Sequence, residues 1–155
     1  IYGGETTVAR LWRWIIDLEQ GTVSEEQLDD GACDFPRIND DRIGLYSQFG
    51  YCMQLKTDVK DLTFGENLYK YRLETGKRID HHLGDNVAGG EPVFAPKPGA
   101  TEEDEGWILS LVHERESRIS KLIIIDAQSF DQPPVAEVII PQRVPYGAHG
   151  SWIQN

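Results

Sequence analysis

A β-prone run that ends in a polar turn recurs three times along this chain at almost constant spacing. The three copies are Trp14–Gly21, Tyr69–Gly76 and Ile123–Gln128. Asp17, Arg72 and Asp126 hold the same place in each copy, so the offsets are 55 and 54 residues. Self-similarity at this period, with strands inside each unit, is typical of propeller blades, in which small sheets are arranged around an axis.

The chain is too short for a complete ring of such blades. A propeller has about four to eight blades of about four strands each, and 155 residues at this spacing hold fewer than three. The sequence also begins at Ile1 rather than at Met. We therefore expect residues 1–155 to be the C-terminal two to three blades of a single longer propeller domain whose N-terminal part is absent.

Hydrophobic patterning elsewhere predicts further strands and no convincing amphipathic helix. Residues 12–18 alternate between apolar and more polar side chains, the period-2 pattern of a half-buried strand. Pro36 should lie at the edge or start of its strand because it cannot donate to a ladder. Polar residues 24–31 and residues 56–67 are expected to be loops. Strands are expected at 33–39, 45–55, 68–73, 77–83, 91–96, 107–114, 121–127 and 135–140, which makes the chain an all-β protein.

The balance of charge and the cysteine count limit the partners and the compartment. The 26 acidic residues against 15 Lys and Arg give a formal net charge of −11. Affinity for nucleic acid comes largely from Lys and Arg, so we expect no nucleic-acid partner. No apolar run reaches the roughly 20 residues of a membrane span. Cys33 and Cys52 lack metal-type spacing, which predicts packing positions and a reducing, cytoplasmic location.

Histidines are the formal candidates for metal ligands, because neutral imidazoles bind transition metals. His81 and His82 are adjacent on a predicted strand and point to opposite faces, so they cannot both reach one ion in regular β geometry. His113 lies at the polar end of a strand, where solvent exposure is expected. His149 differs, since residues 144–150 surround it with one proline and two glycines. Such irregular backbone is suited to close approach to a ligand or an axis.

Two carboxylates stand out by their surroundings. Glu91 opens an otherwise apolar strand, and Asp34 precedes a Phe-Pro pair. Each is either a turn acid or the acceptor that orients a metal-bound imidazole by taking its distal N–H. The acidic run 102–105 lacks the spaced ligands of a calcium loop, so a solvated turn is expected there.

Six blocks of sequence, spread over nearly the whole chain, share their order and spacing with one known family. The blocks are residues 33–39, 90–96, 102–107, 124–127, 134–136 and 143–150. They resemble the C-terminal part of the carotenoid cleavage oxygenases. That family includes the retinal pigment epithelium isomerase, plant carotenoid cleavage dioxygenases and bacterial stilbene-cleaving enzymes.

The resemblance implies a seven-bladed β-propeller with a non-haem Fe(II) on its axis, held by four histidines from different blades. It also implies that O2 cleaves a conjugated C=C bond of a carotenoid or apocarotenoid into two carbonyl products. His149 matches the family's last iron-binding histidine. The three preceding ligands would lie upstream of Ile1, so His81, His82 and His113 are not expected to take their places.

Other positions receive expectations from the same resemblance. Glu91 matches one of the glutamates that hydrogen-bond to the ligand imidazoles. Asp34 falls where many members carry another glutamate, and its side chain is shorter. Ala148 stands where a bulkier aromatic residue is common. The implied partners are a lipophilic polyene or stilbene, O2 and, for the full-length protein, peripheral contact with a membrane.

Three other functions stay open at the level of sequence. A stilbene-cleaving dioxygenase of the same family would use the same iron. A propeller could also be a non-catalytic binding scaffold, with His149 a packed core residue. A hydrolase could use Glu91 and Asp34 as an acid–base pair, and its activity would not respond to chelators.

Overall fold

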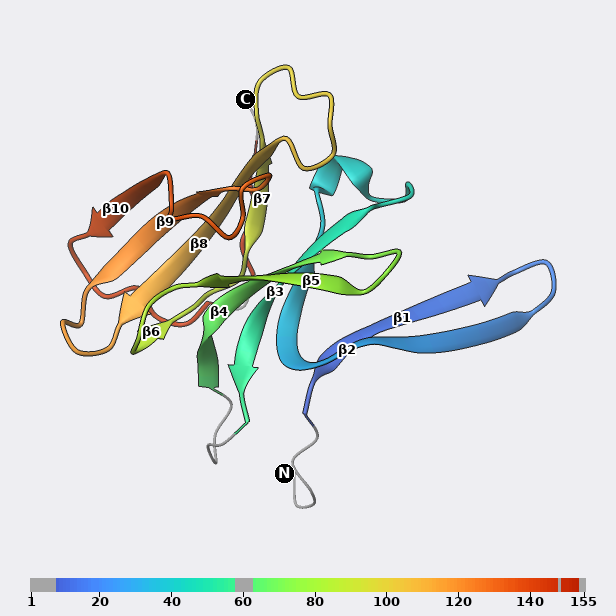
Figure 1. Ribbon diagram of the computed structural model, residues 1–155, viewed down its shortest axis with the longest axis horizontal. Helices are drawn as coiled ribbons and strands as arrows, with labels where there is room; N and C mark the ends of the chain where they lie inside the picture. Colours follow the sequence, from blue (N-terminus) through green and yellow to red (C-terminus); the bar gives the residue numbers. More distant parts are fainter. Residues whose placement is uncertain (1–7, 58–62, 148, 154–155) are drawn as a thin grey trace.

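The computed structural model describes residues 8–57, 63–147 and 149–153, and most of its ordered structure is β-strand (Figure 1). The only helical element within these ranges is a short 3-10 turn, η1 (Asp40–Arg42), where Asn39 accepts a hydrogen bond from the Asp41 amide. The expected all-β class is therefore confirmed. The strands are β1 (Arg10–Asp17), β2 (Thr22–Arg37), β3 (Phe49–Lys56), β4 (Thr63–Arg72), β5 (Lys77–His82), β6 (Val87–Ala88), β7 (Val93–Pro96), β8 (Gly106–Glu114), β9 (Ser120–Asp126) and β10 (Ala136–Ile140).

The strands form two antiparallel sheets of five strands each. The first has the order β1-β2-β3-β4-β5, and the second has the order β10-β9-β8-β6 with β7 also paired to β8. Neighbours in sequence are mostly neighbours in the sheets, so β2 to β5 and β7 to β10 are two successive four-stranded meanders. The turn between β4 and β5 contains Gly76, whose positive φ of 67° favours glycine.

Strand β2 belongs to two pairings in succession. Its first half pairs with β1 from Trp12↔Gln27 to Asp17↔Thr22, and its second half pairs with β3 through Cys33↔Gln54 and Asp34↔Met53. The expected loop at 24–31 is therefore wrong, because pairing with β1 gives this polar stretch partners for its backbone groups. Between Asp34 and Arg37 the register shifts. Pro36 lies in this irregularity, as its missing N–H predicts.

The principal hydrophobic core lies where the two sheets meet. Tyr51 of β3 packs on Phe94 of β7 and on Phe130, with ring centroids 6.1 and 6.0 Å apart. Ile108 of β8 and Ile125 of β9 are completely buried in the same cluster. Full burial of one such side chain contributes about 1.5–3 kcal/mol. The strongly apolar run 122–125 thus turns Ile123 and Ile125 into the core, while Leu122 and Ile124 on its other face are half-buried. Cys33 and Cys52 are buried and free, which confirms the packing positions expected for them.

The acidic run 102–105 ties the sheets together and is not simply a solvated turn. The Glu103 carboxylate accepts hydrogen bonds from the Gln48 and Phe49 amides at 2.8 and 2.9 Å. Asp104 accepts one from the buried Lys70 ammonium at 2.7 Å, and the same ammonium donates to the Ala127 carbonyl. The acidic composition of the run predicted exposure to solvent, but the Glu103 and Asp104 carboxylates accept hydrogen bonds from residues more than thirty positions away.

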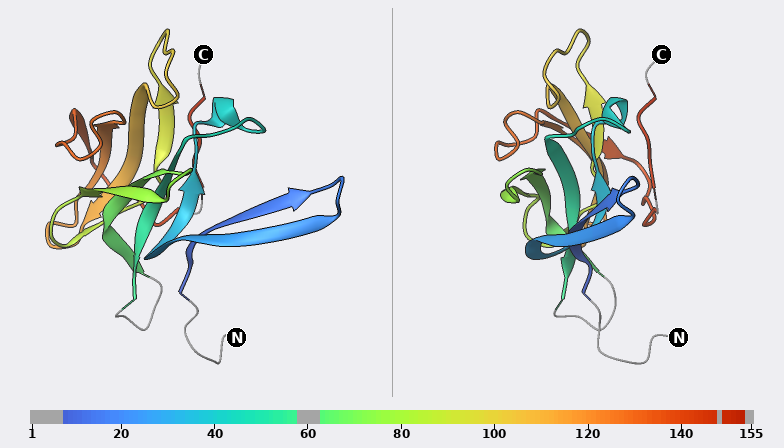
Figure 2. Two further views of the ribbon diagram at one scale, coloured as in Figure 1. Left: turned by 45° about the vertical axis from the view of Figure 1, so that its right-hand side comes forward. Right: turned by 90° about the vertical axis from the view of Figure 1, so that its right-hand side faces the viewer.

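The β1–β2 hairpin extends away from the two packed sheets (Figures 1 and 2). Its apolar side chains are largely uncovered: Trp14 is 59% exposed, Ile16 64% and Leu18 90%. The alternation at 12–18 predicted a half-buried strand. Strand β1 forms, but within the described residues no second layer covers this side of it.

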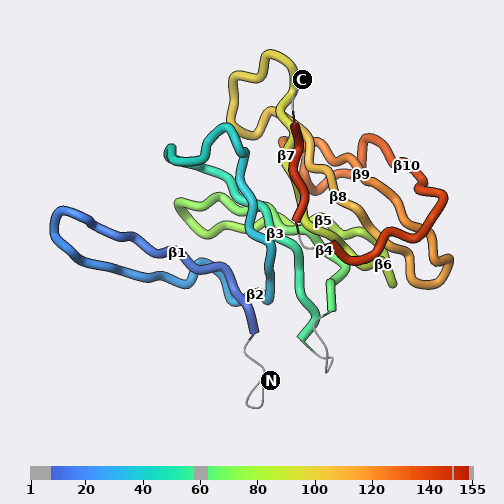
Figure 3. The backbone as a smooth tube through the Cα atoms, turned by 180° about the vertical axis from the view of Figure 1, so that it is seen from behind, coloured from blue at the N-terminus to red at the C-terminus, as the bar shows by residue number. Residues whose placement is uncertain are grey.

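The C-terminal segment, residues 143–153, returns across the second sheet and runs beside β7 (Figure 3). Val144 is fixed on the way by a hydrogen bond from its amide to the Ser120 hydroxyl at 2.9 Å. This path brings His149 and Gly150 next to the loop that leads into β7 and next to the end of β2. Three segments that are far apart in sequence therefore meet at one place.

Candidate metal centre

Glu91 and His149 are joined directly. His149 Nδ1 lies 3.0 Å from Glu91 Oε1, and the Gly150 amide donates to Glu91 Oε2 at 2.6 Å. The carboxylate therefore holds both the imidazole and the backbone that carries it. Because Nδ1 donates its proton to the carboxylate, Nε2 is the nitrogen that keeps a lone pair. The His149 side chain is 74% exposed, so this lone pair is accessible to an ion.

Local packing against β8 aims Glu91 at the C-terminal segment. Gly90 lies so close to β8 that a Cβ atom there would fall 2.3 Å from the Leu111 carbonyl oxygen. Its own carbonyl accepts a hydrogen bond from the Ser110 hydroxyl at 3.1 Å. Pro92 on the other side is fully buried. The backbone on both sides of Glu91 is thus fixed, and only 9% of its side chain is exposed.

Arg37, at the end of β2, completes the environment of Glu91. One guanidinium nitrogen lies 3.1 Å from Glu91 Oε1 and donates to the Gly150 carbonyl at 2.6 Å, while the other pairs with Asp40 at 3.1 Å. Burial by itself would raise the pKa of the Glu91 carboxyl. The hydrogen bonds from His149, Gly150 and Arg37 outweigh burial and lower that pKa, so Glu91 is a carboxylate at neutral pH.

Aromatic side chains form a wall beside the imidazole. The Phe35 and His149 rings pack edge to face with their centroids 5.4 Å apart. The centroids of Phe35 and Phe64 are 5.8 Å apart, and those of Phe64 and Tyr146 are 4.8 Å apart. Phe35 has a φ of +55°, which is uncommon for a residue with a side chain. Such strain often marks a functional site, and here it turns the Phe35 ring toward the imidazole.

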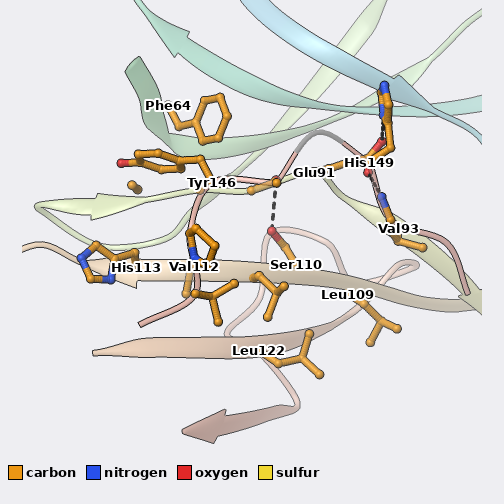
Figure 4. Close-up of a pocket in the computed structure, with 18 of the residues that line it drawn as sticks. Phe64, Glu91, Val93, Leu109, Ser110, Val112, His113, Leu122, Tyr146 and His149 are labelled. Carbon is orange, nitrogen blue, oxygen red and sulfur yellow. Dashed lines mark hydrogen bonds and ion pairs between the residues drawn. The ribbon is translucent and has the colours of Figure 1, made fainter. Parts of the chain in front are cut away.

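An apolar cavity of about 260 Å³ adjoins this wall. Figure 4 shows Glu91 and His149 at one end of it and Phe64, Tyr146 and His113 at the other. Leu109, Leu111 and Leu122 from the outer face of β8 and β9 line its floor. Most of the lining is apolar and suits a largely nonpolar molecule, while Glu91, His113, Arg143 and His149 are also among the lining residues.

The structure does not bring Asp34 to the His149–Glu91 pair. The Asp34 carboxylate accepts a hydrogen bond from the Phe35 amide next to it at 2.7 Å. In the part of the chain that the structure describes, no hydrogen bond or ion pair joins Asp34 to Glu91 or His149. Ala148 lies outside the described residues.

The other histidines lie away from His149. His81 is buried, with Nδ1 2.8 Å from the Phe130 carbonyl, whereas His82 on the opposite face of β5 is exposed, as their adjacency predicts. His113 is half-buried at the far end of the cavity, 3.3 Å from the Ser120 hydroxyl, and not fully in solvent as expected. Among the described residues, no group of three or more His, Cys, Asp or Glu side chains could hold a metal ion. Within the described residues, His149 could therefore supply only one donor to a metal ion.

Sequence reasoning singled out Glu91 and His149, and it did not indicate that Arg37, Phe35 and Tyr146 lie around them. All three lie inside the blocks that carry the family resemblance, at 33–39 and 143–150. The Phe-Pro pair after Asp34 gave no signal of the positive φ at Phe35, because the residue before a proline ordinarily takes an extended conformation. Nothing in the sequence near Arg37 indicated which carboxylate it would meet.

Comparison with known proteins gives one consistent result. Residues 3–154 match the family model described as retinal pigment epithelial membrane protein (RPE65). The chain is 30% identical to the apocarotenoid-15,15'-oxygenase of Synechocystis over 94% of its length, and 35% identical to a carotenoid cleavage oxygenase of Mycobacterium tuberculosis over 97%. It is also 32% identical to the carotenoid 9,10(9',10')-cleavage dioxygenase 1 of Pisum sativum.

Solved structures agree with the sequence matches. The crystal structure of cobalt-substituted Synechocystis ACO superimposes with a TM-score of 0.85 at 30% identity, covering 94% of this chain. The chain spans about 30% of the length of these relatives. Within the described residues there is no helix long and apolar enough to cross a membrane. With a family model that matches almost every residue, the chain belongs to the carotenoid cleavage oxygenase (RPE65) family.

Proposed function

We propose that residues 1–155 are the C-terminal part of a non-haem Fe(II) dioxygenase that cleaves a conjugated C=C bond of a carotenoid or apocarotenoid with O2 to give two carbonyl products. The observation that carries the proposal is the His149–Glu91 pair, in which the carboxylate accepts a hydrogen bond from Nδ1–H, so that Nε2 keeps its lone pair. Family membership and the apolar cavity beside the pair support it.

Each residue of the site has a role in this proposal. His149 would hold Fe(II) through Nε2, and Glu91 would keep the proton on Nδ1, which fixes the ring and makes Nε2 a better metal ligand. Fe(II) held there would supply the redox centre that O2 chemistry needs. Phe35, Phe64 and Tyr146 would give that centre a nonpolar wall on one side, against which a polyene could lie. Asp34 is assigned to an imidazole that this chain does not contain.

The same proposal covers the architecture. We assign the chain to the C-terminal end of a seven-bladed propeller, with β2 to β5 and β7 to β10 as two blades and the β1–β2 hairpin as the outer pair of strands of a third. The double pairing of β2 supports this, because it passes from one sheet unit into the next. Thirty per cent of seven blades is about two blades, which agrees with the share of the relatives that is covered.

The experiment uses the complete protein that contains this chain, purified without oxygen. We expect bound iron in the unsubstituted protein and O2-dependent loss of polyene absorbance, with two carbonyl products identified by mass spectrometry. His149→Ala should remove iron and activity while circular dichroism still reports the β-structure. Normal turnover by this variant would refute the assignment.

Three alternatives make different predictions in the same assay. A stilbene-cleaving enzyme would bind iron but turn over hydroxystilbenes in place of apocarotenoids. A binding scaffold would purify without metal. A hydrolase based on Glu91 and Asp34 would keep its activity in the presence of chelators. Such a mechanism requires a protonated acid, which the ion pair with Arg37 and the lowered pKa of Glu91 disfavour.

We further propose that the complete protein is cytoplasmic and takes its lipophilic substrate up by peripheral contact with membranes. The nonpolar cavity supports a substrate that partitions into lipid. Co-sedimentation with phosphatidylcholine vesicles tests this, and a protein that stays in the supernatant would contradict it.

A further inference from the structure

Arg37 is the side chain that joins the three segments of the site. It lies at the end of β2, and it contacts Glu91, 54 residues away, and Gly150, 113 residues away. Its second nitrogen pairs with the Asp40 carboxylate at 3.1 and 3.2 Å, which holds the guanidinium plane in place. Only 16% of the side chain is exposed. Such a set of contacts requires a fork of donors, which Arg has and Lys lacks.

The positive charge of Arg37 compensates the negative charge of the Glu91 carboxylate. The carboxylate is nearly buried, and an isolated buried carboxylate would be costly. Arg37 and His149 share the same oxygen, Oε1, with donor distances of 3.1 and 3.0 Å. The guanidinium therefore sets the position of the oxygen that accepts the hydrogen bond from His149 Nδ1.

The backbone of the ligand is held by the same two side chains. Glu91 Oε2 accepts from the Gly150 amide, and Arg37 donates to the Gly150 carbonyl, so the residue after His149 is fixed at both of its polar groups. The His149 side chain is otherwise mostly in solvent, so its imidazole keeps one orientation only while Gly150 stays in place.

We propose that Arg37 is a positioning residue for the metal ligand: it acts through Glu91 and the Gly150 carbonyl to fix the orientation and donor strength of His149. This inference rests on the proposed function, since it assigns Arg37 to the same Fe(II) site. Arg37 does not touch the metal, and the effect of removing it is transmitted by the two groups it holds.

The test measures metal binding and a spectroscopic signature in the complete protein. Fe(II) affinity is determined by anaerobic titration, and Co(II) added in place of Fe(II) reports ligand geometry through its visible absorption. Arg37→Met should weaken Fe(II) binding by about tenfold, the lower end of the effect of groups that orient metal ligands, and should shift the Co(II) bands. Arg37→Lys should show a smaller loss of Fe(II) affinity and a smaller shift of the Co(II) bands than Arg37→Met. Lysine keeps the positive charge but cannot reach Glu91, the Gly150 carbonyl and Asp40 at once.

Arg42→Met is the matched control. Arg42 lies in the same stretch of chain and pairs with Glu103 and the Tyr46 carbonyl, away from Glu91. It should leave the affinity and the Co(II) spectrum unchanged. In a Glu91→Gln background, adding Arg37→Met should weaken Fe(II) binding much less than it does alone, because both changes break one chain of contacts.

The outcomes separate this inference from the proposed function. An unsubstituted protein that binds neither Fe(II) nor Co(II) overturns both. A protein that binds metal, but whose folded Arg37→Met variant keeps the same affinity and Co(II) spectrum, overturns the role of Arg37 alone. If Arg37→Met does not fold, Arg37→Lys decides: a Co(II) spectrum and affinity identical to those of the unsubstituted protein overturn the inference.

Discussion

The packed pair of sheets and the β1–β2 hairpin are both regular antiparallel structure, yet they differ in what covers their apolar side chains. In the paired sheets, Ile108 and Ile125 are completely buried. In the hairpin, Trp14 and Ile16 are more than half exposed although both lie in a well-paired strand. Hydrogen bonding between neighbouring strands thus fixes the hairpin. The packed pair of sheets, called the body below, is also stabilised by the packing of one sheet on the other.

This difference shows that local pairing and burial are separate requirements in this fold. Residues 12–18 alternate as a strand with one covered face should. The described residues supply no layer for that face, so its apolar surface fits contact with another part of a larger protein. The site, in contrast, is built entirely from segments that the body holds in place.

The largest predicted effect tests whether the hairpin is covered in the complete protein. If β1 belongs to a third blade, Trp14→Ala should lower the free energy of unfolding by about 3–5 kcal/mol, as removal of a buried Trp does. Denaturant unfolding of the complete protein measures this. The position is 59% exposed in the present structure, so contacts within this chain give no reason for so large a loss.

Ile125→Ala provides the reference, since this side chain is buried within the chain itself and its loss should cost about 2–5 kcal/mol in any context. A loss of less than about 0.5 kcal/mol for Trp14→Ala, typical of surface substitutions, would mean that the hairpin projects into solvent. The assignment of the hairpin to a third blade would then be wrong.

The same contrast explains how far the sequence could be interpreted. Strands whose pattern is set by their own residues, such as β5 and β8, were predicted nearly to their ends. The polar half of β2 was missed because its pairing with β1, not its composition, decides its structure. Glu103 was missed for a similar reason, since the Gln48 and Phe49 amides that it binds lie more than fifty residues away.

In the site, the resemblance singled out Glu91 and His149 separately, each by its place in a sequence block. The structure adds that the two side chains are 3.0 Å apart, a contact that the sequence did not predict, and their roles at a metal stay a prediction. Arg37 had no signal, because its role depends on the C-terminal segment meeting the end of β2. The positive φ of Phe35 could not be read from the sequence either, because the residue before a proline ordinarily takes an extended conformation with negative φ.

The second prediction compares the two carboxylates of the body. Glu91→Gln should weaken Fe(II) retention in the complete protein by about 10–100-fold, because a neutral amide is a poorer acceptor for the His149 proton. Asp34→Asn should weaken it less, since Asp34 accepts from the amide of its own neighbour and not from His149. Anaerobic dialysis against a chelator, followed by iron analysis, measures both variants.

Equal losses in the two variants would contradict the ranking drawn from this structure. They would show that Asp34 supports an imidazole from outside the chain as strongly as Glu91 supports His149. Fe(II) retention by Glu91→Gln equal to that of the unsubstituted protein would remove the evidence that the carboxylate tunes the ligand.

The smallest predicted effect concerns pH and compares the buried and exposed faces of β5. His81 is sealed in the body, with Nδ1 donating to the Phe130 carbonyl at 2.8 Å, and its buried Nε2 has no partner among the described residues. Burial, aided by the neighbouring charge of His82, lowers the pKa of His81 below its ordinary 6.5. The unfolded chain therefore binds a proton more readily than the folded one in the range just below that value.

Stability from His81 is thus fully present above about pH 6.5 and is lost as the pH falls toward the lowered folded pKa, at up to about 1.4 kcal/mol per pH unit. His81→Gln keeps an N–H donor for the carbonyl but cannot titrate, so its free energy of unfolding should fall less steeply between pH 6.5 and 5.5. His82→Gln, on the exposed face of the same strand, should follow the unsubstituted protein. If the His81 and His82 variants show the same slope as the unsubstituted protein, the acid sensitivity does not originate from this buried imidazole, and the charges of other regions, the hairpin included, must be responsible for it.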